Sequence, residues 1–239
     1  MKCCLLNPKR ALITVMVNDL ALLRLLQLVS PGLPIGLYSY SQGMEGAVEE
    51  KLVTTTDQVY EWIEGLLEQG MAQIDLPILS RLFDAWSVND QAAVAYWSAT
   101  LMAYRETFEL RAEDRQAGQA LARLLVELGL EDAAFWLRRS DATLANLYTL
   151  AAVRWGVPKQ QAMLGYVWSW LENQVLCAVK LVPLGQVAGQ RLLMALAEQL
   201  PAQVERAESL TDEAMGGSAF GLALLSSRHE MQYSRLFRS

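Results

Sequence analysis

The sequence predicts a single, all-helical domain. Apolar residues recur at spacings of three and four along most of the chain, which is the period of an amphipathic helix. β-Branched residues do not form the alternating runs that are typical of strands. With 239 residues, 53% of them hydrophobic, the chain can bury a sizeable core without disulfides or metals. No repeat or low-complexity segment divides it, so we expect about ten helices around one core.

Capping residues and proline or glycine breaks delimit the helices expected in the first half. Asn18 and Asp19 cap the first helix, and the run Ser30-Pro31-Gly32 follows its end. Proline is tolerated in a first helical turn, so Asp75-Leu76-Pro77 is typical of a helix start. The expected helices are 18–28, 39–50, a third capped within 54–57, a fourth that starts at 75, and a fifth from about 90 to 128.

The second half follows the same pattern and ends in a tail. The expected helices are 140–156, 157–181, 186–208 with a kink at Pro201, and a last helix that Ser218 caps after the linker 215–218. We expect residues 1–17 to be a disordered extension, residues 18–230 to form the domain, and residues 231–239 to be a C-terminal tail.

Composition excludes several classes of protein. The net charge of -6 argues against nucleic-acid binding, which needs a basic surface. The three cysteines, Cys3, Cys4 and Cys177, offer no disulfide framework, so a cytoplasmic location fits best. The most apolar window, 162–182, contains charged and amide residues that are costly inside a bilayer, so we expect no membrane span.

The sequence also lacks the signatures of catalysis and of metal binding. One histidine, His229, cannot supply the paired motifs of a di-iron bundle, and no nucleophile signature surrounds it. Cys-x-x-Cys and P-loop motifs are absent, and Lys180 is only a formal candidate for a pyridoxal lysine. We therefore expect no catalytic residue, no cofactor of its own and no resident metal.

Three segments are candidates for binding a partner. Residues 30–45 form a Pro- and Gly-rich loop that leads into a helix, and the alternative is an ordinary connection anchored by tyrosines. Residues 180–186 join two long helices, and the alternative is a plain helix end. The final segment, 227–239, mixes arginines with aromatic residues, as interface anchors do, and the alternative is that it packs on its own domain. The candidate partner-binding residues are Glu45, Lys180, Pro183, Gly185, Gln186, Arg228, His229, Glu230, Tyr233, Arg235, Leu236, Phe237, Arg238 and Ser239.

A fourth segment, residues 104–115, is dense in charge. Arg105 and Glu109 are four residues apart, and Arg111 and Asp114 are three apart, as in ordinary ion pairs along one helix. We expect this segment to form a solvated or salt-bridged helix face.

The chain resembles the UreF family of urease accessory proteins. The matching segments, in order, are residues 26–45, 105–114, 170–173, 180–186 and 228–239. Two features depart from the family: Leu37 replaces a usual glycine, and residues 1–17 match nothing.

The resemblance implies an all-α dimer without enzymatic turnover. Members of the family bind the accessory protein UreD (UreH in some organisms) and recruit the GTPase UreG to apo-urease, where nickel is inserted. They are described as coupling UreG to that complex and as helping to form a passage for nickel. By this resemblance the tail and the 180–186 loop would contact UreD or order on binding it, and Glu45 and Lys180 would lie on the surface that governs UreG. With one histidine, any nickel contact would be transient.

Two other readings of the sequence remain open. The chain could be an all-helical enzyme that acts on a small apolar substrate with Glu45 or Glu172 as general base, which a closed apolar pocket would favour. It could also be a helical adaptor unrelated to urease.

Overall fold

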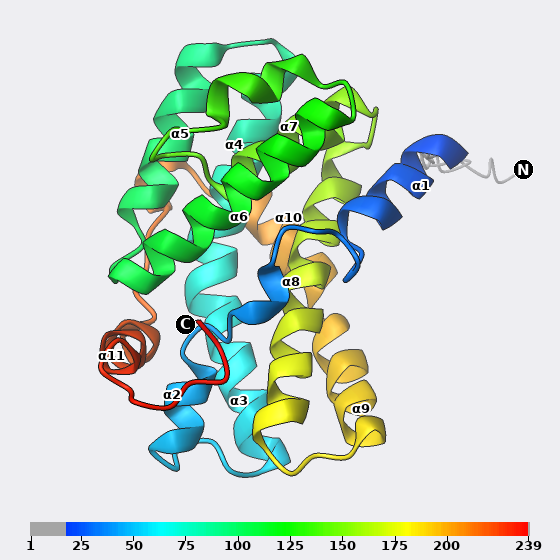
Figure 1. Cartoon of the computed structure of the whole chain (residues 1–239). Coiled ribbons are helices and arrows are strands. Elements are labelled where there is room, and N and C mark those ends of the chain that lie inside the picture. Colours follow the sequence, from blue (N-terminus) through cyan, green and yellow to red (C-terminus); the bar gives the residue numbers. More distant parts are fainter. Residues whose placement is uncertain (1–17, 239) are drawn as a thin grey trace, which may run out of the picture.

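The computed structural model describes residues 18–238, and within them the chain is helical without any strand (Figure 1). The expectations for residues 1–17 lie outside the described residues. The α-helices are α1 (Asp19–Leu28), α2 (Met44–Glu49), α3 (Thr56–Leu66), α4 (Leu76–Ser87), α5 (Gln91–Ala103), α6 (Phe108–Glu127), α7 (Leu144–Arg154), α8 (Lys159–Leu181), α9 (Gln186–Ala197), α10 (Leu200–Ser209) and α11 (Phe220–His229). The all-α, single-domain prediction is confirmed.

Helix α4 begins at Leu76 with Pro77 in its first turn, as predicted, but no loop separates it from the preceding helix. A π-helix, η2 (Leu67–Asp75), joins α3 directly to α4. Pro77 lacks an N–H, and the carbonyl of Gln73, four residues earlier, accepts a hydrogen bond from Gly216 instead, at 3.2 Å. A distant loop therefore satisfies the carbonyl that the proline leaves free.

The single long helix predicted from 90 to 128 is wrong. It is two helices, because α5 ends at Ala103 and Thr107 adopts an extended conformation, with φ -104° and ψ 163°. The Thr107 side chain accepts the Leu110 N–H at 3.2 Å and so caps α6. The four-residue interruption turns the charged segment 104–115 toward the core.

Three expectations for the second half also need correction. Thr143, rather than Ser140 or Asp141, caps α7, and the short 3₁₀ helix η3 (Glu131–Trp136) precedes it. The 186–208 helix divides into α9 and α10. The Ser218 hydroxyl contacts Glu106 at 3.4 Å and does not cap α11.

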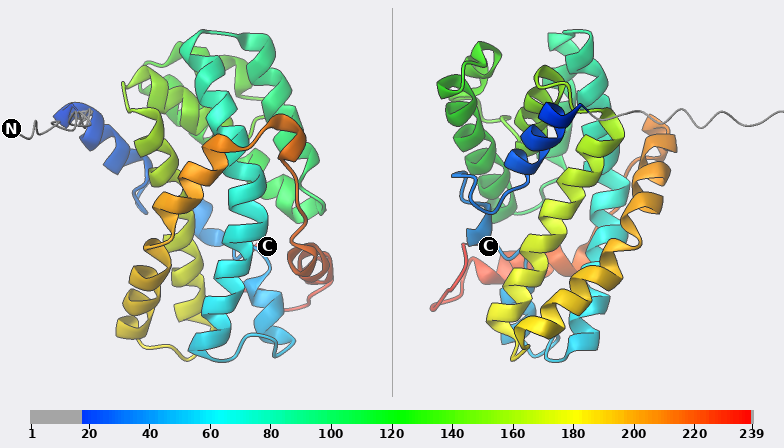
Figure 2. Two further views of the ribbon diagram at one scale, coloured as in Figure 1. Left: turned by 180° about the vertical axis from the view of Figure 1, so that it is seen from behind. Right: turned by 90° about the vertical axis from the view of Figure 1, so that its right-hand side faces the viewer.

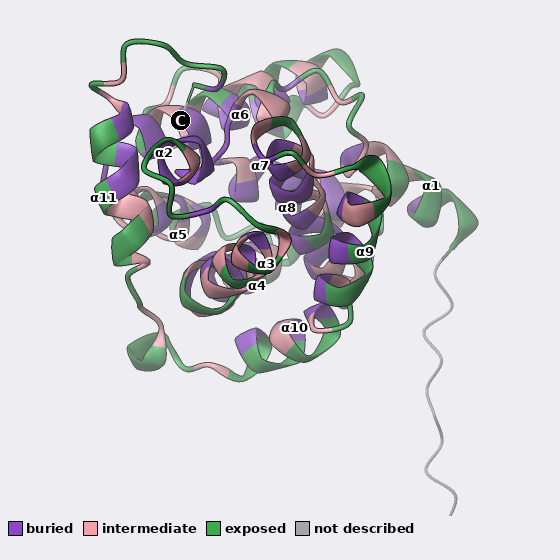
Figure 3. Ribbon diagram, turned by 90° about the horizontal axis from the view of Figure 1, so that it is seen from below, coloured by how far each residue is buried: buried purple, intermediate pink, exposed green. Residues whose placement is uncertain are grey.

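Helix α8 is the centre of the fold. It contacts α1, α2, α3, α4, α7, α9 and α10. From behind, α9 packs against α8, and α10 crosses α8 and α4 (Figure 2). Buried residues face inward along these helices, and exposed residues lie on the periphery (Figure 3). A Cβ at Gly165 of α8 would lie 2.6 Å from Leu25 Cδ1, so this glycine lets α1 lie closely on α8.

Two further helical segments complete the description. The 3₁₀ helix η1 (Leu37–Ser39) lies in the loop before α2, and the 3₁₀ helix η4 (Asp212–Ala214) lies between α10 and α11. No helix in the part of the chain that the structure describes is long and apolar enough to cross a membrane.

Candidate functional site

The loop between α1 and α2 is held against the core by side chains of α6 and α8. Asn173 Nδ2 donates to the Tyr40 carbonyl at 3.0 Å. Gln42 Oε1 accepts from Trp170 Nε1, and Gln42 Nε2 donates to Glu113 Oε1, both at 2.7 Å. The loop is therefore more than a simple connection, because the buried amide of Asn173 and the half-buried amide of Gln42 fix its course before α2 begins.

Two glycines allow α11 to lie close to α2. Gly43 has φ 76°, and a Cβ there would lie 2.9 Å from Leu222 Cδ1. A Cβ at Gly46 would lie 3.3 Å from the carbonyl oxygen of Leu225. This close approach brings the end of α11 beside the start of α2.

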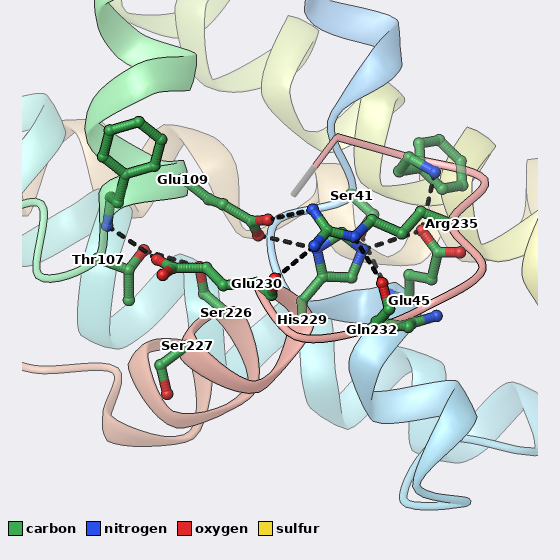
Figure 4. Close-up of polar contacts among 12 residues, drawn as sticks. Ser41, Glu45, Thr107, Glu109, Ser226, Ser227, His229, Glu230, Gln232 and Arg235 are labelled. Carbon is green, nitrogen blue, oxygen red and sulfur yellow. Dashed lines mark hydrogen bonds and ion pairs between the residues drawn. The ribbon is translucent and has the colours of Figure 1, made fainter.

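The end of α11 meets two carboxylates there (Figure 4). The His229 side chain is buried, with Nδ1 2.8 Å from Glu109 Oε2 and Nε2 3.3 Å from Glu45 Oε2. Arg235 Nη1 donates to Glu109 Oε1 at 2.8 Å. We call Glu45, Glu109, His229 and Arg235, together with the main chain of residues 236–238, the C-terminal clasp.

The tail's main chain completes the clasp. Glu45 Oε1 accepts the Leu236 N–H at 2.6 Å, and Glu45 Oε2 accepts the Phe237 N–H at 2.8 Å. The Arg238 N–H donates to the Ser39 carbonyl at 2.8 Å. Three successive amides of the tail are thus bound by the segment that contains the loop and α2.

The tail presents two different faces. The Phe237 ring is buried, with Lys180 Nζ 5.4 Å from the ring centroid. Met231, Tyr233 and Leu236 are 87%, 103% and 63% exposed. One face of the tail therefore anchors it to the domain, and the other offers large apolar side chains to solvent.

Every carboxylate of the clasp has hydrogen-bond partners. Both ring nitrogens of His229 face carboxylate oxygens, Nδ1 that of Glu109 and Nε2 that of Glu45. The guanidinium of Arg235 is paired with the buried carboxylate of Glu109, and two main-chain N–H groups of the tail donate to the buried carboxylate of Glu45. Removing any of these partners would leave a buried carboxylate less well satisfied.

A second buried cluster forms around Arg105 in place of the predicted pairs Arg105–Glu109 and Arg111–Asp114. Arg105 contacts Asp75 through Nη1 at 3.1 Å and Asp114 through Nε at 2.9 Å. Burial opposes the charge of the guanidinium, but the two carboxylates outweigh it and raise the Arg105 pKa above its usual range. Of the two predicted alternatives, the solvated face is wrong, because Glu109 and Glu113 are also buried, and the salt-bridged face is confirmed by the Arg105–Asp114 and Arg235–Glu109 pairs.

A cavity of about 100 Å³ borders this second cluster, with Gln42 and Tyr166 among its lining residues. Burial raises the pKa of the Tyr166 hydroxyl well above its usual value. Neither Glu45 nor Glu172, the candidate general bases, lines the cavity. Glu172 instead accepts the Tyr38 hydroxyl at 3.1 Å, so the geometry gives the enzyme reading no support.

The structure corrects the expected positions of two site features. Glu45 is buried and does not present its charge to solvent. The tail, which we expected to order on another chain, lies on its own domain as far as Arg238, whereas Ser239 lies outside the described residues. Pro183, Gly185 and Gln186 are exposed.

The remaining predicted residues occupy the edge of the clasp. Arg228 pairs with Glu50 at 2.6 Å. Glu230 Oε1 accepts the Phe108 N–H at 3.1 Å, which ties the end of α11 to the first turn of α6. The Ser226 hydroxyl of the same helix lies 2.7 Å from the hydroxyl of Thr107.

Sequence reasoning missed Glu109. Its spacing indicated a partner along its own helix, whereas its partners come from α11 and the tail. The available signal was the single histidine, because a carboxylate is a common hydrogen-bond partner of an imidazole. Among residues 18–238, no group of three or more His, Cys, Asp or Glu side chains is placed to hold a metal ion.

Comparison with known proteins identifies the family. Residues 53–197 match the UreF family model. The urease accessory protein UreF of Alkalilimnicola ehrlichii is 53% identical over 220 residues, covering 92% of this chain and 96% of the relative. The UreF proteins of Hahella chejuensis and Alcanivorax borkumensis are each 45% identical and cover 92% and 93% of this chain and 99% and 100% of their own lengths. With a matching family model and relatives that align over almost their whole length, the chain belongs to the UreF family of urease accessory proteins.

Proposed function

We propose that this protein is a non-enzymatic, cytoplasmic scaffold for urease maturation. It binds UreD (UreH) and, through that partner, brings the GTPase UreG to apo-urease for nickel insertion. Membership of the UreF family supports a role in urease maturation, and the partners are our proposal. Nickel is cargo here: the protein contacts it in transit and holds none of its own.

The two-faced tail is the observation that supports this proposal most directly. Its main chain is bound by Glu45 and Ser39, while Met231, Tyr233 and Leu236 remain exposed. Large apolar side chains on a fixed main chain are suited to an interface, because little ordering entropy is lost on binding. We therefore assign UreD binding to the exposed face of the tail.

Deletion of residues 233–239 tests this assignment. The truncated chain should retain its helicity by circular dichroism but lose co-purification with UreD. Because the deletion also removes the anchor Phe237, the variant Tyr233→Ala is a second test: Tyr233 is fully exposed, so its loss should weaken UreD capture without affecting the fold.

The matched control is Tyr96→Ala, which removes an exposed tyrosine of α5. It should leave UreD capture unchanged. Full capture by the truncated chain would exclude the tail as the UreD-binding element.

We place the surface that governs UreG around Lys180, the loop 182–185 and the first residue of α9. Lys180 lies against the Phe237 ring, so a partner on this loop can sense whether the tail is docked. The exposed residues Pro183 and Gly185 lie in the same loop, and the exposed Gln186 begins α9 directly after it. The expected effect of Lys180→Ala is altered GTP hydrolysis by UreG within the assembled complex, measured as phosphate release, without loss of UreD capture.

We also propose that the protein forms a homodimer through α1. Leu20, Leu22, Leu23 and Leu26 are each between 46% and 61% exposed, which is unusual for one short helix. A second copy of the helix would cover this face.

A further inference from the structure

Phe108 forms a ridge between two hollows on the surface of α6. The first hollow has a volume of about 330 Å³ and the second about 420 Å³, and both are lined by Phe108 and Ala112. The Phe108 side chain is 63% exposed, although it stands in the first turn of α6. This is a shaped, partly apolar surface at the edge of the clasp.

Arginines line both hollows. Arg235 and Arg238 of the tail line the first, and Arg111 and Arg115 of α6 line the second. Arg111 donates to the carbonyls of residues 105 and 106, and within the described residues neither it nor Arg115 forms an ion pair. Cationic side chains thus gather at one place on a chain whose net charge is -6.

The carboxylates that line the same hollows are already engaged. Glu109 is bound by His229 and Arg235, and Glu230 accepts the Phe108 N–H. Asp141 is paired with Arg139 through two hydrogen bonds, at 2.8 and 2.6 Å. Arg235 is itself engaged by Glu109 and by main-chain carbonyls, so the groups left to meet a ligand are the guanidinium groups of Arg238, Arg111 and Arg115 and the Phe108 ring.

We propose that this surface, the Phe108 ridge, docks an acidic segment of a partner protein. An apolar side chain of that segment would lie on Phe108, and carboxylates on either side of it would enter the two hollows. Guanidinium groups form forked hydrogen bonds with carboxylates, which gives such docking a defined register. The overall negative charge disfavours long polyanions such as nucleic acids, which would contact far more of the surface. The inference rests on the proposed function, because the partner that would dock on the Phe108 ridge is a urease maturation protein.

A fluorescein-labelled peptide of sequence Glu-Glu-Leu-Glu-Glu serves as the probe. Its anisotropy is measured with the full chain, with Arg111→Glu/Arg115→Glu, and with the control Arg123→Glu/Arg191→Glu, which reverses two exposed arginines elsewhere. Both double variants change the net charge by the same amount. A difference in peptide affinity between them therefore indicates a local binding site. We expect affinity to fall at least roughly tenfold in the ridge variant and to change little in the control.

Binding should also weaken with added salt, and a peptide with glutamines in place of the glutamates should not bind. Equal loss in the two double variants, or no binding of the acidic peptide to the unchanged protein, would overturn the proposal.

Capture of UreD and UreG by the same variants separates this inference from the proposed function. If tail truncation abolishes capture while Arg111→Glu/Arg115→Glu retains both partners, the scaffold function stands and the Phe108 ridge is wrong. If the ridge variant loses a partner and the control keeps it, the ridge is supported. If the unchanged protein captures neither partner, the proposed function itself fails.

Discussion

The Glu45 carboxylate accepts the main-chain N–H of Phe237 at 2.8 Å, joining residues that are 192 positions apart in the sequence. The other oxygen of the same carboxylate accepts the N–H of Leu236. A single buried side chain of α2 thereby fixes the direction of the C-terminal tail. This contact makes the position of the tail a property of the fold and not only of a complex.

Replacing Glu45 by glutamine should loosen the tail. The amide has one acceptor oxygen, so its NH₂ group must face one of the two N–H groups of residues 236 and 237, and it removes the charge opposite His229. Hydrogen bonds to a charged group contribute roughly 1.5–3 kcal/mol each. We expect the amides of Leu236 and Phe237 to exchange hydrogen faster, measured by hydrogen–deuterium exchange.

The matched control for that experiment is Glu49→Gln, an exposed position of the same helix. It should leave exchange at residues 236 and 237 unchanged. Full protection of both amides in the Glu45→Gln variant would show that other contacts hold the tail.

Arg105→Leu should destabilise the whole domain. Its guanidinium is the shared partner of Asp75 and Asp114, whose side chains are each 6% exposed, and removing it leaves two buried carboxylates without their cation. Breaking a buried ion pair costs roughly 3–5 kcal/mol of unfolding free energy. Urea denaturation followed by circular dichroism measures the loss. Arg123→Leu, on an exposed face of α6, should change the stability by less than about 0.5 kcal/mol, and equal effects would contradict the role assigned to Arg105.

Local signals predicted most of the fold, and long-range contacts account for the errors. The cap at Asn18 and the long helix ending at Leu181 follow from side chains near in sequence, and both agree with the structure. The interruption at residues 104–107 contains Arg105, which reaches Asp75, thirty residues away, and no spacing along the chain encodes that contact. For this reason the helical spacing of apolar residues predicted one continuous helix across the interruption.

The candidate site shows the same limit. The tail was singled out by its composition, but the carboxylates that bind it, Glu45 and Glu109, stand far away in the sequence. Composition indicates that Phe237 is an anchor and does not tell whether the anchor is buried in its own domain or in another chain. Only the fold answers that question for the free protein.

Cys177 should resist alkylation in the folded protein. Burial raises the pKa of its thiol from 9.0 to about 12, so little reactive thiolate exists at pH 8. In a Cys3→Ser/Cys4→Ser variant, the rate of iodoacetamide modification should rise about tenfold per pH unit up to pH 11, because the thiolate fraction does so below the pKa.

The denatured chain provides the control for that measurement. In urea the thiol recovers its ordinary pKa, and its alkylation rate should level off above about pH 9.5. Because the folded pKa is the raised one, the thiol favours folding below pH 9, and this contribution declines as the pH rises toward 12. A plateau at pH 9 in the folded protein would mean that the thiol is open to solvent.

Charge on the outer face of α1 should dissociate the proposed homodimer. Leu23 and Leu26 are 61% and 54% exposed. In the variant Leu23→Glu/Leu26→Glu, a second copy that covered this face would have to bury two unpaired carboxylates, which is costly. Size-exclusion chromatography with light scattering should then report a monomer of unchanged helicity. The control is Val187→Glu/Met194→Glu on α9, where the side chains are 65% and 70% exposed. If that variant dissociates and the α1 variant stays dimeric, α9 and not α1 forms the interface.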